Sequence, residues 1–296
     1  MSSIAGPSVA APSWFAASKR LAGPALRRLL QNRSFVLGAS LVLFVAVIAL
    51  LAPVLAPYDP TRSNFRDRLA APSMAHWFGT DHFGRDLLSR VIYGGRVSLV
   101  IGFLVVVATG IAGTAIGALA GYFRRLDNPL MRLMDALMAF PAILLAIVIS
   151  AILGASIVNV VIALAIATSP HTARIVRASV LVVREMEYIE AGRALGASDF
   201  RLLFGHVLIN ALAPLIVRLT YVFAIAILAE AVLSYIGVGP PPPTPTFGNI
   251  IASERDFLET APWTVLCPGA AIVISVLGLN LLGDGLRDVL DPRMKL

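Results

Sequence analysis

The chain has 296 residues, of which 58% are hydrophobic and only 14% are charged. A soluble domain carries about 25% charged residues, so the mean hydropathy of +0.84 indicates a protein that lies mostly in lipid. The 24 Lys and Arg residues outnumber the 17 Asp and Glu residues. Because these basic residues lie between long apolar runs, they favour a membrane surface over nucleic acid. A single cysteine, Cys267, excludes an intrachain disulfide framework and a cysteine-based metal site.

The N-terminal region predicts a cytoplasmic tail over residues 1–33, followed by a membrane anchor. The apolar run 35–55 resembles a secretory signal, but it is longer than the roughly 7–15 residues of a signal's apolar core. Pro57 would also follow the candidate cleavage site. We therefore expect a retained first transmembrane helix over residues 34–57.

Five further apolar spans are expected. A helix needs about 20 apolar residues to cross a bilayer core of about 30 Å, and the runs 97–122, 215–238 and 263–282 meet that length. The stretch 133–172 is too long for one helix, and its interruption at residues 154–159 predicts two spans joined by a tight turn. The sequence thus predicts an all-α polytopic membrane protein with six transmembrane helices.

The distribution of Lys and Arg predicts the orientation of these spans, because cytoplasmic loops retain basic residues. With the N-terminus inside, the cytoplasmic segments hold most of the basic residues, including those of a C-terminal tail over residues 285–296. The extracytoplasmic loop 58–96 departs from the rule, although four acidic residues partly offset its arginines. Both termini are therefore expected in the cytoplasm.

Few charged residues fall within the spans. Ionisable residues there are typical of ion pathways, so Asp135 and Glu230 are possible pathway residues; for Glu230, a hydrogen bond between packed helices is the favoured interpretation. Arg174, Arg177 and Arg184 fall on one helical face, which predicts that the fourth span continues past the bilayer with a basic stripe at the lipid headgroups.

Three glycines repeat at four-residue spacing in the second span, at Gly113, Gly117 and Gly121. This spacing places them on one helical face, where a neighbouring backbone can approach closely. The pattern predicts helix packing and no chemistry.

The interior loop 172–214 is too long for a simple connection and is expected to be structured. Within it, apolar positions repeat at i, i+3, i+4 and i+7, at Tyr188, Ala191, Gly192 and Leu195. This pattern predicts a short helix with an apolar face of mostly small side chains, and Gly196 suits a left-handed cap at its C-terminal end.

A second short helix is expected after Gly196. Ser198 can cap it, and Asp199 favours the N-terminal end of its dipole. Its apolar face comprises Phe200, Leu203, Phe204, Val207 and Leu208. Such helices can lie in the membrane interface, but the small side chains of the first helix favour close docking of another protein.

At this point the sequence resembles a known family. Glu190-Ala191-Gly192, followed after three residues by Gly196 and later by Ile209-Asn210, is similar to the EAA loop of binding-protein-dependent ABC importers. In that family the loop forms a coupling helix that inserts into a groove of the cytoplasmic ATPase subunit. The resemblance implies that Tyr188, Glu190, Ala191, Gly192, Leu195 and Gly196 make this contact. The sequence departs from the family pattern at Gly192, usually Ala, and at Ile209, typically Pro.

Further motifs are similar to those of dipeptide, oligopeptide and nickel permeases. They are Phe78-Gly79-Thr80-Asp81, Gly84-Arg85-Asp86, Ser89-Arg90, Gly95 to Leu99, Leu233 to Gly237, Pro240 to Pro243 and Phe247-Gly248-Asn249. The ending, Gly283 to Asp288 with Asp291-Pro292-Arg293, resembles the C-type member of the permease pair.

The resemblance implies the six-helix architecture of type I ABC importer permeases, with a core over residues 97–284. It also implies a bacterial inner (plasma) membrane location, a heterodimer with a second homologous permease, two cytoplasmic ATP-binding subunits and an extracytoplasmic substrate-binding protein. The substrate would be a dipeptide or oligopeptide, with nickel as the alternative. The loop 58–96 and residues 239–262 would face the binding protein or lie at the membrane interface.

No catalytic residue, metal or cofactor is expected in this chain. A phosphate-binding loop needs Gly-x4-Gly-Lys-Ser/Thr, and neither Lys19 nor Lys295 has that context, so ATP and Mg would bind to the partner ATPase subunits. A metal enzyme built on the four histidines is disfavoured, because His76 and His82 are expected outside the membrane and the other two inside. No hydrolase motif occurs.

Overall fold

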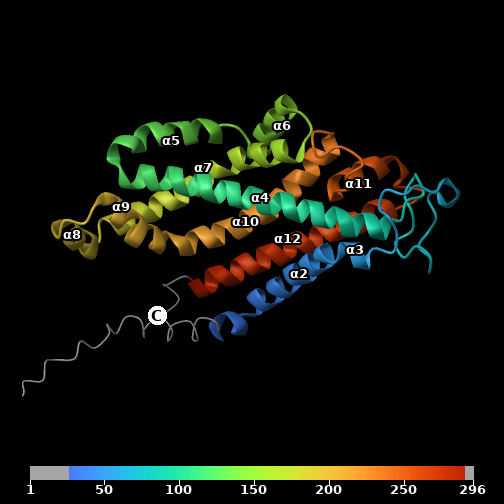
Figure 1. Cartoon of the computed structure of the whole chain (residues 1–296), viewed down its shortest axis with the longest axis horizontal. Helices are drawn as coiled ribbons and strands as arrows, with labels where there is room; N and C mark the ends of the chain where they lie inside the picture. Colours follow the sequence, from blue (N-terminus) through green and yellow to red (C-terminus); the bar gives the residue numbers. More distant parts are fainter. Residues whose placement is uncertain (1–26, 291–296) are drawn as a thin grey trace, which may run out of the picture.

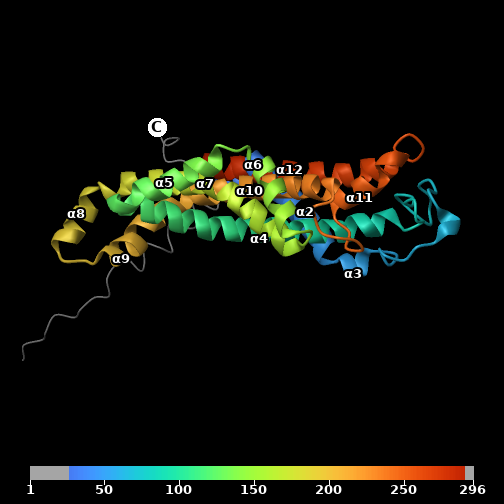
Figure 2. The ribbon, with the colours of Figure 1, turned by 90° about the horizontal axis from the view of Figure 1, so that it is seen from above.

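The computed structural model describes residues 27–290, and every regular element in that range is helical. Most of the predicted N-terminal tail and the motif Asp291-Pro292-Arg293 lie outside the described residues. The long helices run side by side along one axis in an elongated bundle (Figure 1). Seen at 90° to that view, the bundle is narrow, and α8 extends beyond the other helices at one end (Figure 2).

Within residues 27–290, five helices are long and apolar enough to cross a membrane, and there are six crossings if a bent pair of shorter helices counts as one span. The five are α2 (Arg33–Leu50), α4 (Leu87–Tyr122), α7 (Ile157–Arg184), α10 (Leu208–Ile236) and α12 (Trp263–Leu290). The bent pair is α5 (Arg124–Met138) and α6 (Ala142–Leu153). This arrangement agrees with the predicted all-α polytopic fold.

Three of these helices, α4, α10 and α12, are longer than the predicted spans. α4 begins at Leu87, ten residues before the predicted start at 97, because the Asp86 side chain caps it by accepting a 2.8 Å hydrogen bond from the Ser89 N–H. The irregular part of the outer loop therefore ends at Asp86. α12 continues past residue 282 to Leu290, since its last turns pack beside α2.

The third span is broken, which the sequence analysis did not predict. α5 and α6 meet at an angle of 89°, and Pro141 lies at the junction as the N-cap of α6. Proline has no N–H to donate and disfavours helical backbone in the residue before it, so the helix ends there. α6 has 12 residues, about 18 Å of helix, which is too short to cross the bilayer core by itself.

The tight turn predicted between the third and fourth spans is present. Gly154 ends α6 with a φ of 88°, a left-handed value that favours glycine. Ser156 caps α7 by accepting from the Val158 N–H at 3.2 Å. Asn159 donates to the Leu153 carbonyl at 2.8 Å, which closes the turn.

The core lies where α4, α7 and α10 meet. Its buried side chains include Ile101, Val105, Val160, Leu164, Val222 and Leu233. On the outer side, α11 (Phe247–Glu254) packs against α10 and α12, and α2 packs along α12. A short helix, α3 (Ala52–Leu55), follows α2. These contacts make one continuous bundle.

The glycine face of α4 packs directly on α7, as predicted. A Cβ atom added at Gly113 would lie 2.7 Å from the Thr172 Cβ, and one added at Gly121 would lie 2.8 Å from the Val180 Cβ. At Gly117 the nearest atom is the main-chain oxygen of Ala173. Even one methyl group on this face would separate the two helices.

We expect Gly117→Ala to lower the thermal stability of the purified protein, because overpacking against a main-chain atom costs about 1–3 kcal/mol. That cost exceeds the gain of about 1 kcal/mol from the higher helix propensity of alanine. Gly269→Ala is the matched control, since a Cβ atom on this α12 residue would meet nothing within 4 Å. Equal melting temperatures for the two variants in detergent would contradict the predicted close packing.

Candidate functional site

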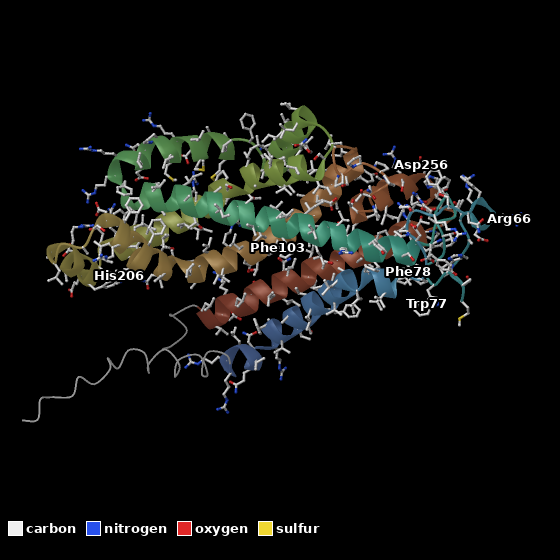
Figure 3. The ribbon with its side chains drawn as sticks, in the orientation of Figure 1. Arg66, Trp77, Phe78, Phe103, His206 and Asp256 are labelled. Carbon is white, nitrogen blue, oxygen red and sulfur yellow. The ribbon has the colours of Figure 1, made fainter. Side chains whose placement is uncertain are left out.

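One end of the bundle carries the residues predicted to contact an ATPase. α8 (Glu187–Ala194) follows α7 after a short break, and α9 (Asp199–Leu202) follows a corner at Gly196. We call residues 187–202 the tip segment. It lies at the opposite end of the molecule from Arg66 and Asp256, and His206 lies beside it (Figure 3).

The corner of the tip segment has the geometry predicted from its glycine. Gly196 has a φ of 83°, and its N–H donates to the Arg193 carbonyl at 3.0 Å. The Ala197 N–H donates to the Gly192 carbonyl at 3.1 Å. These two bonds form a Schellman motif, which satisfies the last carbonyls of a helix when the next residue is left-handed. As predicted, Ser198 then caps α9 by accepting from the Arg201 N–H.

The predicted apolar face of α8 points outward. Tyr188 is 46% exposed and Leu195 is 89% exposed, and Ala191 and Glu190 are also exposed. Gly192 is half-buried. The Leu202 side chain lies next to it, and a Cβ atom added at Gly192 would be 3.0 Å from the Leu202 Cδ2. The structure therefore keeps most of the six predicted contact residues accessible to a partner.

Ile189 holds α8 on the bundle, and the sequence analysis missed it. Its side chain is fully buried in a cluster with Val183, Leu202, Leu203 and Val207. Ile189 and Leu195 are the two large aliphatic residues between positions 187 and 196. The expectation that a short helix buries one large side chain against the bundle would therefore have left these two as candidates. Burial of Ile189 fixes which face of α8 is presented.

The second short helix is not a separate element, contrary to the prediction. α9 continues through a π-helical turn, η2 (Leu203–Val207), directly into α10. Leu203 and Val207 are buried, whereas Phe200 and Phe204 are exposed and stack with ring centroids 5.8 Å apart. The predicted apolar face is thus divided between the bundle and the surface. The tip segment is joined rigidly to the fifth span.

The basic stripe of α7 pairs with carboxylates of α5, a contact that the sequence analysis did not foresee. Arg174 donates to Asp135 at 2.6 Å, and Arg177 makes two bonds to Asp127, at 2.5 and 2.6 Å. The Arg174–Asp135 pair is about half exposed, and such pairs contribute about 0–1 kcal/mol. This pair joins α5 to α7, a contact that fits the helix-packing interpretation of Asp135.

The third arginine of the stripe connects α7 to the end of α4. Arg184 donates to the main-chain carbonyl of Gly121 at 2.8 Å and to the Glu185 carboxylate, also at 2.8 Å. The hydrogen bonds from Arg184 lower the pKa of the Glu185 carboxyl below its ordinary value. This residue pair marks the point where α7 ends and the tip segment begins.

Glu230 is fully buried and joins three elements. Its two carboxylate oxygens accept from the Ser98 hydroxyl of α4 at 2.9 Å and from the Ser234 hydroxyl of α10 at 2.6 Å. The Thr246 hydroxyl, just before α11, lies 3.3 Å from the Ser234 hydroxyl. These bonds favour the interpretation of Glu230 as a helix-packing residue.

The loop between α3 and α4 forms a folded cap at the end opposite the tip segment. Asp81 accepts from the Arg85 Nε at 2.6 Å and from two main-chain N–H groups. His82 Nδ1 lies 2.6 Å from the buried carboxylate of Glu254 in α11, which joins the loop to the bundle. His76 pairs separately with Asp86. Among residues 27–290, no three metal-binding side chains come together.

The comparisons with known proteins agree with this geometry. Residues 113–296 match the family described as binding-protein-dependent transport system inner membrane component. Residues 21–72 match the N-terminal transmembrane domain of oligopeptide transport permease C. The helices long and apolar enough to cross a membrane, together with these matches, define the class, a multi-pass membrane permease. The chain belongs to the binding-protein-dependent transport system inner membrane components, as its sequence resemblance predicted.

Several relatives cover nearly the whole chain. A putative peptide transport system permease of Brucella abortus is 55% identical, over 91% of each chain. A dipeptide transport system permease of Alkalihalophilus pseudofirmus is 45% identical, over 92% of this chain and 90% of the relative. A di/tripeptide transport system permease of Pseudomonas aeruginosa is 46% identical, over 89% of each chain. The similarity therefore extends over both ends of the bundle.

We expect Ile189→Ala to loosen α8 without unfolding the spans, because truncation of a buried aliphatic side chain costs about 2–5 kcal/mol. Hydrogen–deuterium exchange should increase at residues 187–202 and remain unchanged in α4 and α10. Leu195→Ala is the control, since this side chain is 89% exposed. Equal exchange in the two variants would show that Ile189 does not hold the tip segment.

Proposed function

We propose that this chain is a permease subunit of an ATP-driven importer of dipeptides or oligopeptides. It crosses the bacterial inner (plasma) membrane with both termini in the cytoplasm and forms the translocation pathway with a second, homologous permease. The names of the relatives, which are peptide and dipeptide permeases, favour peptides over nickel, the alternative substrate.

The presentation of α8 is the observation that carries this proposal. Its outward face has small side chains at Ala191 and Gly192 beside the protruding Leu195, so a groove on a cytoplasmic ATP-binding subunit can receive it closely. The buried Ile189 and the continuous helix from α9 into α10 connect that face to the spans. Movement of the ATPase subunits would then move α7 and α10 as rigid bodies and alternate access to the pathway.

ATP and Mg bind to two partner subunits in this scheme. The sequence has lysines only at positions 19 and 295, and neither can serve a phosphate-binding loop. The chain therefore transmits movement and makes or breaks no bonds. Purified without its partners, it should hydrolyse no ATP.

The cap at the outer end is the proposed contact for a substrate-binding protein. Ion pairs and buried carboxylates hold the loop that follows α3 on the bundle, while Phe65 is 70% exposed, Met74 92% and Trp77 67%. A rigid cap with large exposed apolar side chains suits protein docking. Trp77 could also anchor the cap at the membrane interface.

We expect Gly196→Val to abolish peptide uptake by the assembled transporter while the subunits remain in the membrane. A β-branched residue is strained at the positive φ of this corner. Gly196→Asn is the matched control, because asparagine tolerates the left-handed region, and it should retain most uptake. Full uptake by the valine variant would contradict the role of the corner in coupling.

The substrate can be tested with the complete transporter and its binding protein in proteoliposomes. A labelled dipeptide should accumulate when ATP is supplied, and unlabelled peptides should compete with it. Nickel ions should neither accumulate nor compete. Nickel uptake without peptide uptake would replace the proposed substrate and leave the assignment as an importer permease intact.

A further inference from the structure

A cavity of about 520 Å³ lies between α7, α10 and α12, on the same half of the molecule as the tip segment. Its lining is Ile175, Asn210, Ala213, Pro214, Val217, Arg218, Tyr221, Arg287 and Leu290. The walls are thus mostly apolar, with two arginines among them. Neither the tip segment nor the cap at the opposite end explains why two arginines line an apolar cavity.

Arg218 has a buried N–H group without a hydrogen-bond acceptor in the described part of the chain. Its Nε atom is buried and has no hydrogen-bond partner in the described part of the chain, and Arg218 forms no ion pair with residues 27–290. Arginine remains charged in proteins, and a buried donor or charge without a partner is costly. An anion in the cavity would balance the charge of the Arg218 guanidinium, which has no acidic partner among residues 27–290.

Arg287 adds a second positive charge to the same cavity from the last turn of α12. It also forms no ion pair among the described residues. The nearby carboxylate of Asp284 accepts a hydrogen bond from the Tyr221 hydroxyl. Asp284 forms no ion pair with either arginine among the described residues.

The position of the cavity favours an anion that also has an apolar part. Arg218 is ten residues from the start of α10 at Leu208, about 15 Å along the helix. Ile175, on the α7 wall, is adjacent to Arg174, which pairs with Asp135 at the helix surface. Basic residues near the ends of membrane helices are suited to the level of phospholipid headgroups, and Val217 and Leu290 in the cavity lining offer contacts to an acyl chain.

We propose that this cavity binds an anionic phospholipid, with its phosphate between Arg218 and Arg287. Guanidinium groups bind phosphate through paired, charge-assisted hydrogen bonds. Basic pockets between transmembrane helices on the cytoplasmic side are suited to anionic headgroups. The bound lipid would fill the space between α10 and α12 beside the helix that carries the tip segment.

The test uses the complete transporter in nanodiscs of phosphatidylethanolamine and phosphatidylglycerol. Native mass spectrometry should detect phosphatidylglycerol retained by the wild-type complex after detergent extraction. Arg218→Gln and Arg287→Gln should each weaken retention about tenfold or more, the effect of losing a charge-assisted hydrogen bond. Arg218→Lys should retain more lipid than Arg218→Gln, since it keeps the charge but loses the paired donors.

Arg132→Gln is the matched control, because Arg132 is exposed on α5 and lies outside the cavity. It should retain phosphatidylglycerol like the wild type. Equal retention by all variants would overturn the proposal. Displacement of the lipid by inorganic phosphate, at a phosphate concentration similar to that of the lipid, would identify a soluble anion as the ligand and overturn the proposal. Separation of the two permeases in Arg218→Gln with unchanged lipid would indicate instead that Arg218 pairs with a carboxylate of the partner subunit.

Because Arg287 is exposed, its variant keeps the test valid even if Arg218→Gln folds poorly. The result is also independent of the transported substrate. Loss of lipid retention with normal peptide uptake would support the lipid site and leave the proposed function unchanged. Normal retention in a transporter that imports no peptide would contradict the proposed function alone.

Discussion

The direct contact between α4 and α7 is the constraint on which the rest of the structure depends. Three glycines on α4 let the α7 main chain approach closely, and any added side chain would separate the helices. Contacts of this kind are rigid because no flexible side chain lies between the backbones. Since α8 follows α7 after a short break, the α4–α7 contact also sets where the tip segment lies.

Polar groups in the bundle follow from the absence of water in lipid. Each needs a partner within the protein or at the membrane surface. Glu230 meets this requirement through two hydroxyls, and the arginines of α7 meet it through acidic residues and main-chain carbonyls. Three buried polar atoms lack a hydrogen-bond partner among the described residues: Arg90 Nε, Thr114 Oγ1 and Arg218 Nε. Of these three residues, Arg218 is the one that lines the cavity shared with Arg287.

The proposed function requires this chain to transmit movement, and the geometry of the tip segment suits that task. One buried side chain, Ile189, holds α8 against the bundle. The Schellman corner at Gly196 then returns the chain to α9 without an unsatisfied helix end. Because α9 leads through a π-turn into α10 without a flexible connection, force applied at α8 reaches two spans together. This geometry suits the proposed coupling to separate ATP-binding subunits.

The sequence by itself determined the all-helical membrane fold, the glycine packing face, the turn at Gly154 and the left-handed corner at Gly196. These features depend on local rules: apolar length, helical spacing and the backbone freedom of glycine. Only the tertiary structure decided which face of α8 points outward, because that depends on the cluster that receives Ile189. It also decided the pairing of Arg177 with Asp127 and the placement of Arg218 and Arg287 on one cavity, since residues far apart in sequence meet only after the helices pack.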